Sequence, residues 1–205
     1  NSYYTYDDKN IEAIWYFLKK CYEKGWLYKG TRVLPWCIRC GTSSSKHEMS
    51  DEGWAELTHP GIFVKFPFKG RNKEFLLVWT TTAWTLTSNV AAAVHPDLTY
   101  VKVKIGEEVY YISEGTKNHL DGKYPVIEKV KGKDLIGLEY ISSYEDLPAQ
   151  KNVIHKVVGW DQVNEEEGTG IVHIAPGCGE EDQELGRKEK LKEIAPLDEF
   201  GNFVE

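Results

Sequence analysis

The sequence predicts an α+β protein that is mostly β, with a barrel or sandwich core, peripheral helices and a small CxxC knuckle. Three observations support this class. Many short strand-like segments, separated by turn residues, follow one another from about residue 61. Segments with helical periodicity stand before and after them. A single Cys-x-x-Cys lies between the first helix and the first strand.

The first helix is expected from about Asp7 to Lys24. Apolar residues recur there at helical spacing and form one stripe: Ile11, Ile14, Trp15, Leu18 and Tyr22. Thr5 followed by Asp8 resembles an N-terminal capping signal, and Gly25 is a natural C-terminal stop. We therefore expect a helix of about five turns ahead of the knuckle.

The knuckle follows this helix, in the turn-rich stretch "GWLYKGTRVLPWCIRCGTSSSKHEM". Cys37 and Cys40 offer two metal ligands, whereas a structural zinc site takes four. His47 is near in sequence, but no second CxxC follows, so an incomplete site is expected. We expect reduced thiols rather than disulfides. The predicted division is a helix and zinc-knuckle-like segment at 1–60 and a core at 61–205.

The core is predicted to consist of strands joined by turns, followed by one helix. The strand-like segments are 62–68, 74–82, a hairpin over 90–104 and 109–113, then 124–141, 152–158 and 168–176. The helix is expected to start near Glu180, with acidic residues in its first turn and basic residues later. Asp182 should therefore lie near the positive end of the helix and stay ionised.

Composition and charge exclude some classes of function. The net charge of −7 and the pI near 5.5 argue against nucleic-acid binding over the whole surface. Two basic clusters are interpreted as solvated loops and strand edges: Lys65, Lys69, Arg71 and Lys73, and Lys129, Lys131 and Lys133. No apolar run approaches the roughly 20 residues of a membrane span. The start lacks both a signal peptide and a methionine, so we expect a piece of a larger protein.

The stretch "VWTTTAWTLTSN", Val78 to Asn89, is the first candidate for chemistry. In a strand, Thr80 and Thr82 point to one face and Thr81 to the other, so two hydroxyls could hold a water or a substrate oxygen. Equally, three β-branched residues suit a strand for structural reasons, and Asn89 suits a turn or a cap. Both interpretations stay open on composition alone.

A second stretch, "GTGIVHIAPGCGEED", spans Gly168 to Asp182. A strand delivers His173, and a Pro-Gly turn then leads to Asp182 at the start of a helix. This arrangement could place an imidazole and a carboxylate at the mouth of one pocket, although a single strand histidine is often structural. The sequence contains no Walker, dinucleotide or GxSxG motif.

Taken together, these motifs resemble one family. "VWTTTAWTLTSNVAAAVHPDLTY" resembles the threonine-rich motif of the editing (CP1) domain of isoleucyl-tRNA synthetases, and "EGTGIVHIAPGCGEED" resembles the second editing motif. The opening through "LPWCIRCGTSSSKHEM" resembles the start of the same inserted domain, so the resemblance covers essentially the whole chain. Valyl and leucyl enzymes carry TTRP where this chain has residues 80–83, and valyl enzymes carry lysine at His173.

The resemblance implies a β-barrel-like editing core with peripheral helices, inserted in a Rossmann-type catalytic domain. It implies hydrolysis of the aminoacyl ester of mischarged Val-tRNA(Ile), with Ile-tRNA(Ile) spared. By resemblance, the residues expected to be catalytic are Thr80, Thr81 and Asp182. Those expected to bind substrate are Thr82, Trp84, Asn89, His173 and, again, Asp182. The family usually has proline at Ala83 and Thr87, so a looser loop is expected here.

The resemblance also implies cofactors and partners. Editing needs no cofactor, Cys37 and Cys40 would form half of a zinc site in the full-length protein, and ATP and Mg belong to the catalytic domain. The expected partners are the valine-carrying acceptor end of tRNA(Ile) and the rest of the synthetase, in a cytoplasmic monomer without a membrane. The alternatives are a non-catalytic tRNA- or zinc-binding module, an editing domain that is weak when excised, and a valyl-type editing domain.

Overall fold

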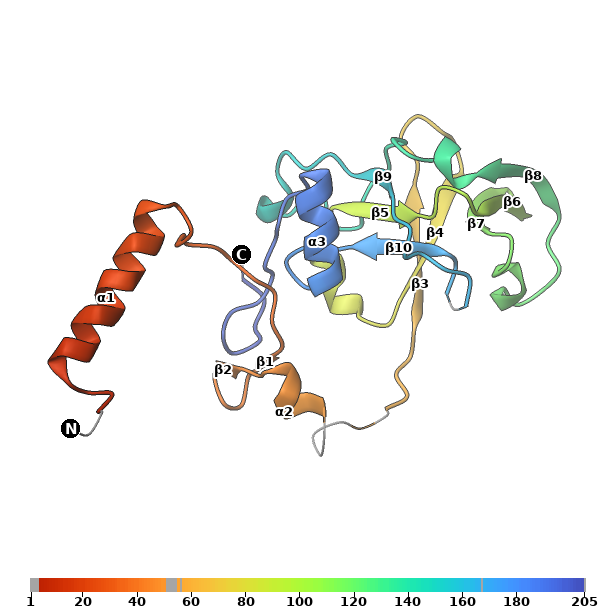
Figure 1. Cartoon of the computed structure of the whole chain (residues 1–205). Helices are drawn as coiled ribbons and strands as arrows, with labels where there is room; N and C mark the ends of the chain where they lie inside the picture. The colour runs from red at the N-terminus through yellow and green to blue at the C-terminus, as the bar shows by residue number, and fades with distance from the viewer. Residues whose placement is uncertain (1–3, 51–54, 56, 167, 205) are drawn as a thin grey trace. The chain divides into compact units, whose positions relative to one another are not determined.

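The computed structural model describes residues 4–50, 55, 57–166 and 168–204 (Figure 1). The chain forms two compact units, divided between Arg32 and Val33. The CxxC segment thus belongs by its contacts to the same unit as the β core, and the division at residue 60 stays a proposal about domain organisation. No helix in the described ranges has the length and apolar character to cross a membrane.

The first unit contains helix α1, Asp8–Glu23, close to the predicted range. The cap is Asp7, whose carboxylate accepts a hydrogen bond from the Lys9 N–H at 3.2 Å. The predicted Thr5–Asp8 capping signal is wrong, because the N-cap is Asp7 rather than Thr5, which makes Asp8 the first residue of the helix. Gly25 follows the helix with φ of 70°, as a C-terminal stop requires. No residue of α1 is buried, so the predicted apolar stripe is largely exposed.

The knuckle consists of a two-stranded hairpin, β1 (Trp36–Cys37) and β2 (Thr42–Ser43), and the short helix α2 (Lys46–Ser50). The Trp36 ring N–H donates to the Glu199 carbonyl oxygen at 2.8 Å. This bond fastens the hairpin to the C-terminal segment of the same unit.

The core is one mixed sheet of eight strands (Figure 1). The strands are β3 (Ile62–Pro67), β4 (Glu74–Thr80), β5 (Ala91–Val94), β6 (Thr99–Ile105), β7 (Glu108–Ser113), β8 (Val126–Lys131), β9 (Lys156–Gly159) and β10 (Ile171–Ile174). Their order is β8-β6-β7-β4-β10-β5-β9, with β3 paired to β4. The sheet curls into half a barrel, so the mostly β, barrel-like prediction is confirmed.

Several segments that the sequence predicts as strands contain shorter strands, with 3₁₀ turns before or after them. Within 124–141, only Val126–Lys131 is a strand, and the 3₁₀ turn η3 (Gly132–Asp134) follows it. Within 152–158, the strand starts only at Lys156, after the 3₁₀ turn η4 (Pro148–Gln150). The predicted strand 74–82 ends at Thr80, and the 3₁₀ helix η1 (Ala83–Ser88) comes next. One further turn, η2 (Lys117–His119), follows β7.

Strand β4 brings distant segments together. One of its edges pairs with β3 in antiparallel fashion over nearly its whole length. The other edge is shared, because Glu74–Leu76 pair in parallel with β7 and Trp79 pairs in parallel with β10. The threonine run that ends β4 therefore lies next to the strand that carries His173.

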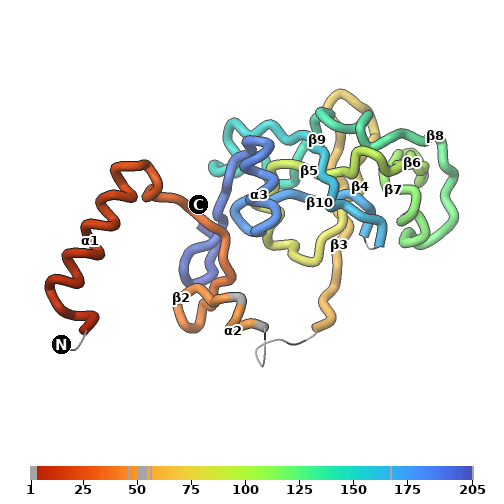
Figure 2. Tube along the Cα trace, viewed as in Figure 1, coloured from red at the N-terminus to blue at the C-terminus, as the bar shows by residue number. Residues whose placement is uncertain are grey.

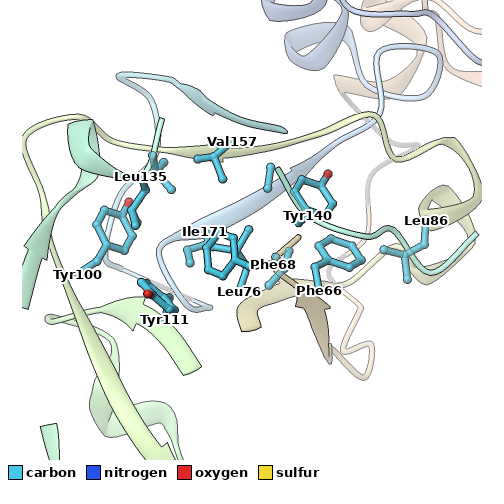
Figure 3. Packing of buried hydrophobic residues seen from close by; sticks show 13 residues of the cluster. Phe66, Phe68, Leu76, Leu86, Tyr100, Tyr111, Leu135, Tyr140, Val157 and Ile171 are labelled. Carbon is cyan, nitrogen blue, oxygen red and sulfur yellow. The ribbon is translucent and has the colours of Figure 1, made fainter. Parts of the chain in front are cut away.

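Two packed layers hold this arrangement in place. Inside the curled sheet, aromatic and aliphatic side chains such as Phe66, Leu76 and Tyr140 are fully buried (Figure 3). The rings of Phe66 and Tyr140 stack with their centroids 4.9 Å apart. On another face, Leu185 of helix α3 (Glu180–Glu189) packs with buried residues of β5, β9 and β10. Figure 2 shows the chain leaving β10 and entering α3 after a short turn. The predicted helix near Glu180 is confirmed, with its acidic first turn.

Candidate active site

A cavity of about 500 Å³ lies where β4, β10 and the start of α3 meet. Its lining comes from four segments, within residues 79–85, 162–164, 168–173 and 178–182. The predicted site residues Thr80, Thr81, Thr82, Trp84, His173 and Asp182 all line it. The two stretches that the sequence singles out thus form a single cavity.

The threonine run turns rather than continuing as a strand. The Thr82 N–H donates to the Thr80 Oγ1 at 3.1 Å, and the Thr82 carbonyl accepts from the Thr85 N–H at 3.0 Å. The expected strand alternation is wrong at Thr82, because these bonds start a 3₁₀ turn in its place. The Thr80 and Thr82 hydroxyls still lie 3.3 Å apart, on the same side of the cavity.

Thr85 is a site residue that the sequence analysis missed. Its buried Oγ1 lies 2.7 Å from His173 Nε2 and 3.3 Å from Thr82 Oγ1, and it donates to the Thr82 carbonyl at 2.7 Å. A continuous chain of hydroxyls therefore runs from Thr80 through Thr82 and Thr85 to the imidazole. The signal that could have found it is the i, i+3 spacing from Thr82, which helical turns place on one face.

The Thr85 hydroxyl has one proton and two hydrogen-bond partners at 2.7 Å, the Thr82 carbonyl and His173 Nε2. The other ring nitrogen of His173, Nδ1, is buried and has no partner among the described residues. Burial lowers the pKa of His173 to about 4, so the imidazole is neutral at pH 7.

Asp182 supplies the carboxylate of the cavity from the first turn of α3. Its Oδ2 accepts a hydrogen bond from the Ala175 N–H at 2.9 Å, which fixes the side chain across the Pro-Gly turn. Burial raises the pKa of Asp182, and the Ala175 hydrogen bond opposes that shift. The site therefore combines hydroxyls, a neutral imidazole and a partly desolvated carboxyl group.

Asn89 is not among the residues that line the cavity, and its place among the substrate-binding residues stays a prediction. Its side chain is fully buried, donates to the Ala91 carbonyl at 2.9 Å and accepts from the Tyr140 hydroxyl at 2.7 Å. Its own carbonyl accepts from Gln150 Nε2 at 3.1 Å. Both Nδ2 and Oδ1 of Asn89 thus bond to groups of the core, at the end of η1.

The loop with the two missing prolines is held by hydrogen bonds. The Thr87 hydroxyl donates to the Trp84 carbonyl at 3.2 Å, and the Thr87 carbonyl accepts from Gln150 Nε2 at 2.6 Å. Ala83 opens η1 at the position where a proline is compatible with a helix. That Ala83 and Thr87 loosen this loop stays a prediction.

The metal prediction concerns the knuckle. The Cys40 N–H donates to Cys37 Sγ at 3.4 Å, and the cysteines form no disulfide. No group of three or more His, Cys, Asp or Glu side chains suited to a metal occurs in the described part of the chain. Two thiols alone do not satisfy the four ligands of a structural zinc ion, so Cys37 and Cys40 stay a predicted half-site.

The fold and the family follow from comparison with known proteins. The family model described as tRNA synthetases class I (I, L, M and V) matches residues 1–140, and the chain belongs to this family. The structure titled GlLeuRS-CP1 shares the fold with a TM-score of 0.56 at 17% identity, over 63% of this chain and 58% of that one. The P. knowlesi cytosolic leucyl-tRNA synthetase editing domain shares the fold with a TM-score of 0.51 at 17% identity, over 63% of each chain.

Within the family, the chain is similar to isoleucine–tRNA ligases. It is 44% identical to that of Pyrococcus furiosus and 42% identical to that of Thermus thermophilus, over 100% of this chain in both cases. It covers 20% of each relative, so it spans about a fifth of the length of the curated relatives it matches. The resemblance predicted from the two motifs is confirmed.

Proposed function

We propose that this chain is the post-transfer editing domain of an isoleucyl-tRNA synthetase. In this proposal it hydrolyses the aminoacyl ester of mischarged Val-tRNA(Ile) and spares Ile-tRNA(Ile). The observation that carries the proposal is the single cavity in which the threonine turn, His173 and Asp182 come together from two distant segments. Its similarity to isoleucine–tRNA ligases supports the choice of amino acid.

The need for such a site follows from the size of the difference between the two amino acids. One methylene in a hydrophobic pocket is worth only about 1–3 kcal/mol, a limit for which isoleucyl-tRNA synthetase is itself the standard example. A second pocket that admits valine and excludes isoleucine corrects the remaining errors.

The cavity can hold the parts of an α-amino ester. The substrate ammonium needs an anion, which Asp182 supplies at the cavity wall. His173 faces the same cavity as a neutral group, so it adds no positive charge that would repel the ammonium. The side-chain pocket is bounded by His173 together with Thr82 or Trp84, which limits the size of the amino acid accepted.

Hydrolysis then proceeds by positioning. The hydroxyls of Thr80 and Thr81 hold the attacking water or the developing oxyanion. The free ribose hydroxyl of the terminal adenosine assists as a proton carrier. No protein side chain acts as an obligatory general base, because the buried imidazole is weakly basic and Asp182 is engaged by the ammonium.

The remaining proposals concern the longer protein. Editing itself takes no cofactor, while Cys37 and Cys40 contribute two ligands to a zinc site completed elsewhere in the synthetase. ATP and Mg serve the catalytic domain. The partners are the acceptor end of tRNA(Ile) and the rest of the synthetase, acting as a monomer in the cytoplasm.

The direct test compares release of amino acid from Val-tRNA(Ile) and Ile-tRNA(Ile) by the isolated chain. The proposal expects fast release of valine and slow release of isoleucine. Equal rates, or tRNA binding without any release, would favour the non-catalytic module. The same assay with the longer synthetase identifies an editing domain that is merely weak when excised.

A further inference from the structure

The last residues of the loop between β9 and β10 form a stretch of the cavity wall that contains two glycines. Gly168, Thr169 and Gly170 line the cavity, and both glycines have φ of 67°. A Cβ on Gly168 would lie 2.8 Å from the Trp79 ring, and one on Gly170 would lie 2.4 Å from Ser113 Cβ. Side chains therefore cannot be added to steady this wall, and hydrogen bonds from behind must hold it.

Three consecutive carbonyl groups of this wall accept hydrogen bonds from the sheet and from the turn η2. The Gly168 carbonyl oxygen lies 2.8 Å from His119 Nδ1, in η2. The Thr169 carbonyl accepts from the Ser113 N–H at 2.9 Å, and the Gly170 carbonyl accepts from the Tyr100 hydroxyl at 2.8 Å. In a trans peptide, the N–H of the next residue points opposite to the carbonyl. The N–H groups of Thr169 and Gly170 therefore point away from β7 and η2, while both residues line the cavity.

Glu165 fastens the same loop from outside the cavity. Its Oε1 accepts from the Gly115 N–H at 2.9 Å and from the Ser113 hydroxyl. Glu165 is not among the residues that line the cavity, although the neighbouring Asn164 is. The next residue, Glu166, is exposed, and within the described part of the chain its one hydrogen bond is from its backbone N–H to Asn164 Oδ1, at 3.0 Å.

We propose that Glu165 is a positioning residue that aims the Thr169 and Gly170 N–H groups at the carbonyl oxygen of the bound ester. This inference rests on the proposed deacylation. Two backbone donors fixed against a developing oxyanion stabilise the transition state, and a displacement of about 1 Å is enough to cost up to about a hundredfold in rate. Glu165 supplies the rigidity that a wall containing two glycines lacks.

The test compares Glu165→Ala, Glu165→Gln and the control Glu166→Ala in deacylation of Val-tRNA(Ile). We expect Glu165→Ala to lower kcat about tenfold to a hundredfold with little change in KM, because the donors act on the transition state. Glu165→Gln keeps an acceptor oxygen for Gly115 and Ser113, so it should recover most of the rate. Glu166→Ala should match the unmodified chain.

A second readout addresses the two donors directly. In the ¹⁵N-labelled chain, the Thr169 and Gly170 amide resonances should shift when a non-hydrolysable, amide-linked valyl adenosine is added, and the shifts should shrink in Glu165→Ala. The positioning role of Glu165 is contradicted if Glu165→Gln is as slow as Glu165→Ala, if Glu165→Ala keeps full kcat, or if neither amide resonance shifts. An unmodified chain that releases no valine contradicts instead the proposed function.

Discussion

Thr85 Oγ1 lies 2.7 Å from His173 Nε2, although 88 residues separate them in the sequence. This bond orients the imidazole ring, and burial keeps the ring neutral at pH 7. It also ties the threonine turn to β10 at the floor of the cavity. The orientation of His173 is thus set by a residue that does not belong to the Thr80–Thr82 run.

Thr85→Val tests this bond, since valine has nearly the same shape but no hydroxyl. The variant leaves His173 Nε2 buried without its hydrogen-bond partner, which should lower the free energy of unfolding by about 1–3 kcal/mol. Thr87→Val is the control within η1, because among the described residues the Thr87 hydroxyl bonds to the Trp84 carbonyl alone. Urea unfolding measures both, and equal small losses would show that the Thr85–His173 bond is unimportant.

We expect the free energy of unfolding to depend on pH because His173 titrates differently in the folded and unfolded states. The unfolded histidine has a pKa near 6.5 and the folded one about 4, so the unfolded state binds the proton first as pH falls. This group contributes stability that is present above pH 6.5 and lost as pH falls toward 4, by about 3 kcal/mol for a shift of about 2.5 pH units.

Two other groups affect the same curve. Burial also lowers the pKa of His155, which contributes with the same sign, whereas burial raises the pKa of Asp182, which contributes with the opposite sign. The comparison must therefore be between the unmodified chain and His173→Gln. The difference between their unfolding free energies at pH 7 and pH 5 should reveal the His173 contribution, and identical pH slopes would contradict it.

Asp182→Asn tests the ammonium anchor. The asparagine oxygen can still accept from the Ala175 N–H, so the fold should persist while the charge is lost. A charge-assisted hydrogen bond is worth about 1.5–3 kcal/mol, so kcat/KM for Val-tRNA(Ile) should fall about tenfold to a hundredfold. Unchanged deacylation in Asp182→Asn and Asp182→Ala would remove Asp182 from the anchoring role.

The internal place of Asn89 also makes a prediction. Asn89→Ala removes the acceptor of the buried Tyr140 hydroxyl and should lower the free energy of unfolding by about 2–3 kcal/mol. Because the two side chains share one bond, Asn89→Ala and Tyr140→Phe should be less than additive in a double-mutant cycle. Strict additivity would show that this hydrogen bond contributes nothing.

The sequence predicts the mostly β class, both long helices and the two stretches that supply most of the cavity lining, because these depend on local periodicity and on recognisable motifs. It misses Thr85, since the turn at Thr82 replaces the expected strand and only tertiary pairing of β4 with β10 creates that partner. It gives no sign that Asn89 is buried, because its partners Tyr140 and Gln150 lie far along the chain. Local propensity cannot reveal such long-range bonds.

The central claim is that the cavity between the threonine turn and α3 hydrolyses the valyl ester and excludes the isoleucyl ester. The most direct measurement is single-turnover deacylation of Val-tRNA(Ile) and Ile-tRNA(Ile) by the unmodified chain and by Asp182→Asn. We predict rapid loss of valine, slow loss of isoleucine, and collapse of the valine rate in the variant. Equal rates for the two esters, or a valine rate that Asp182→Asn leaves intact, would contradict the account.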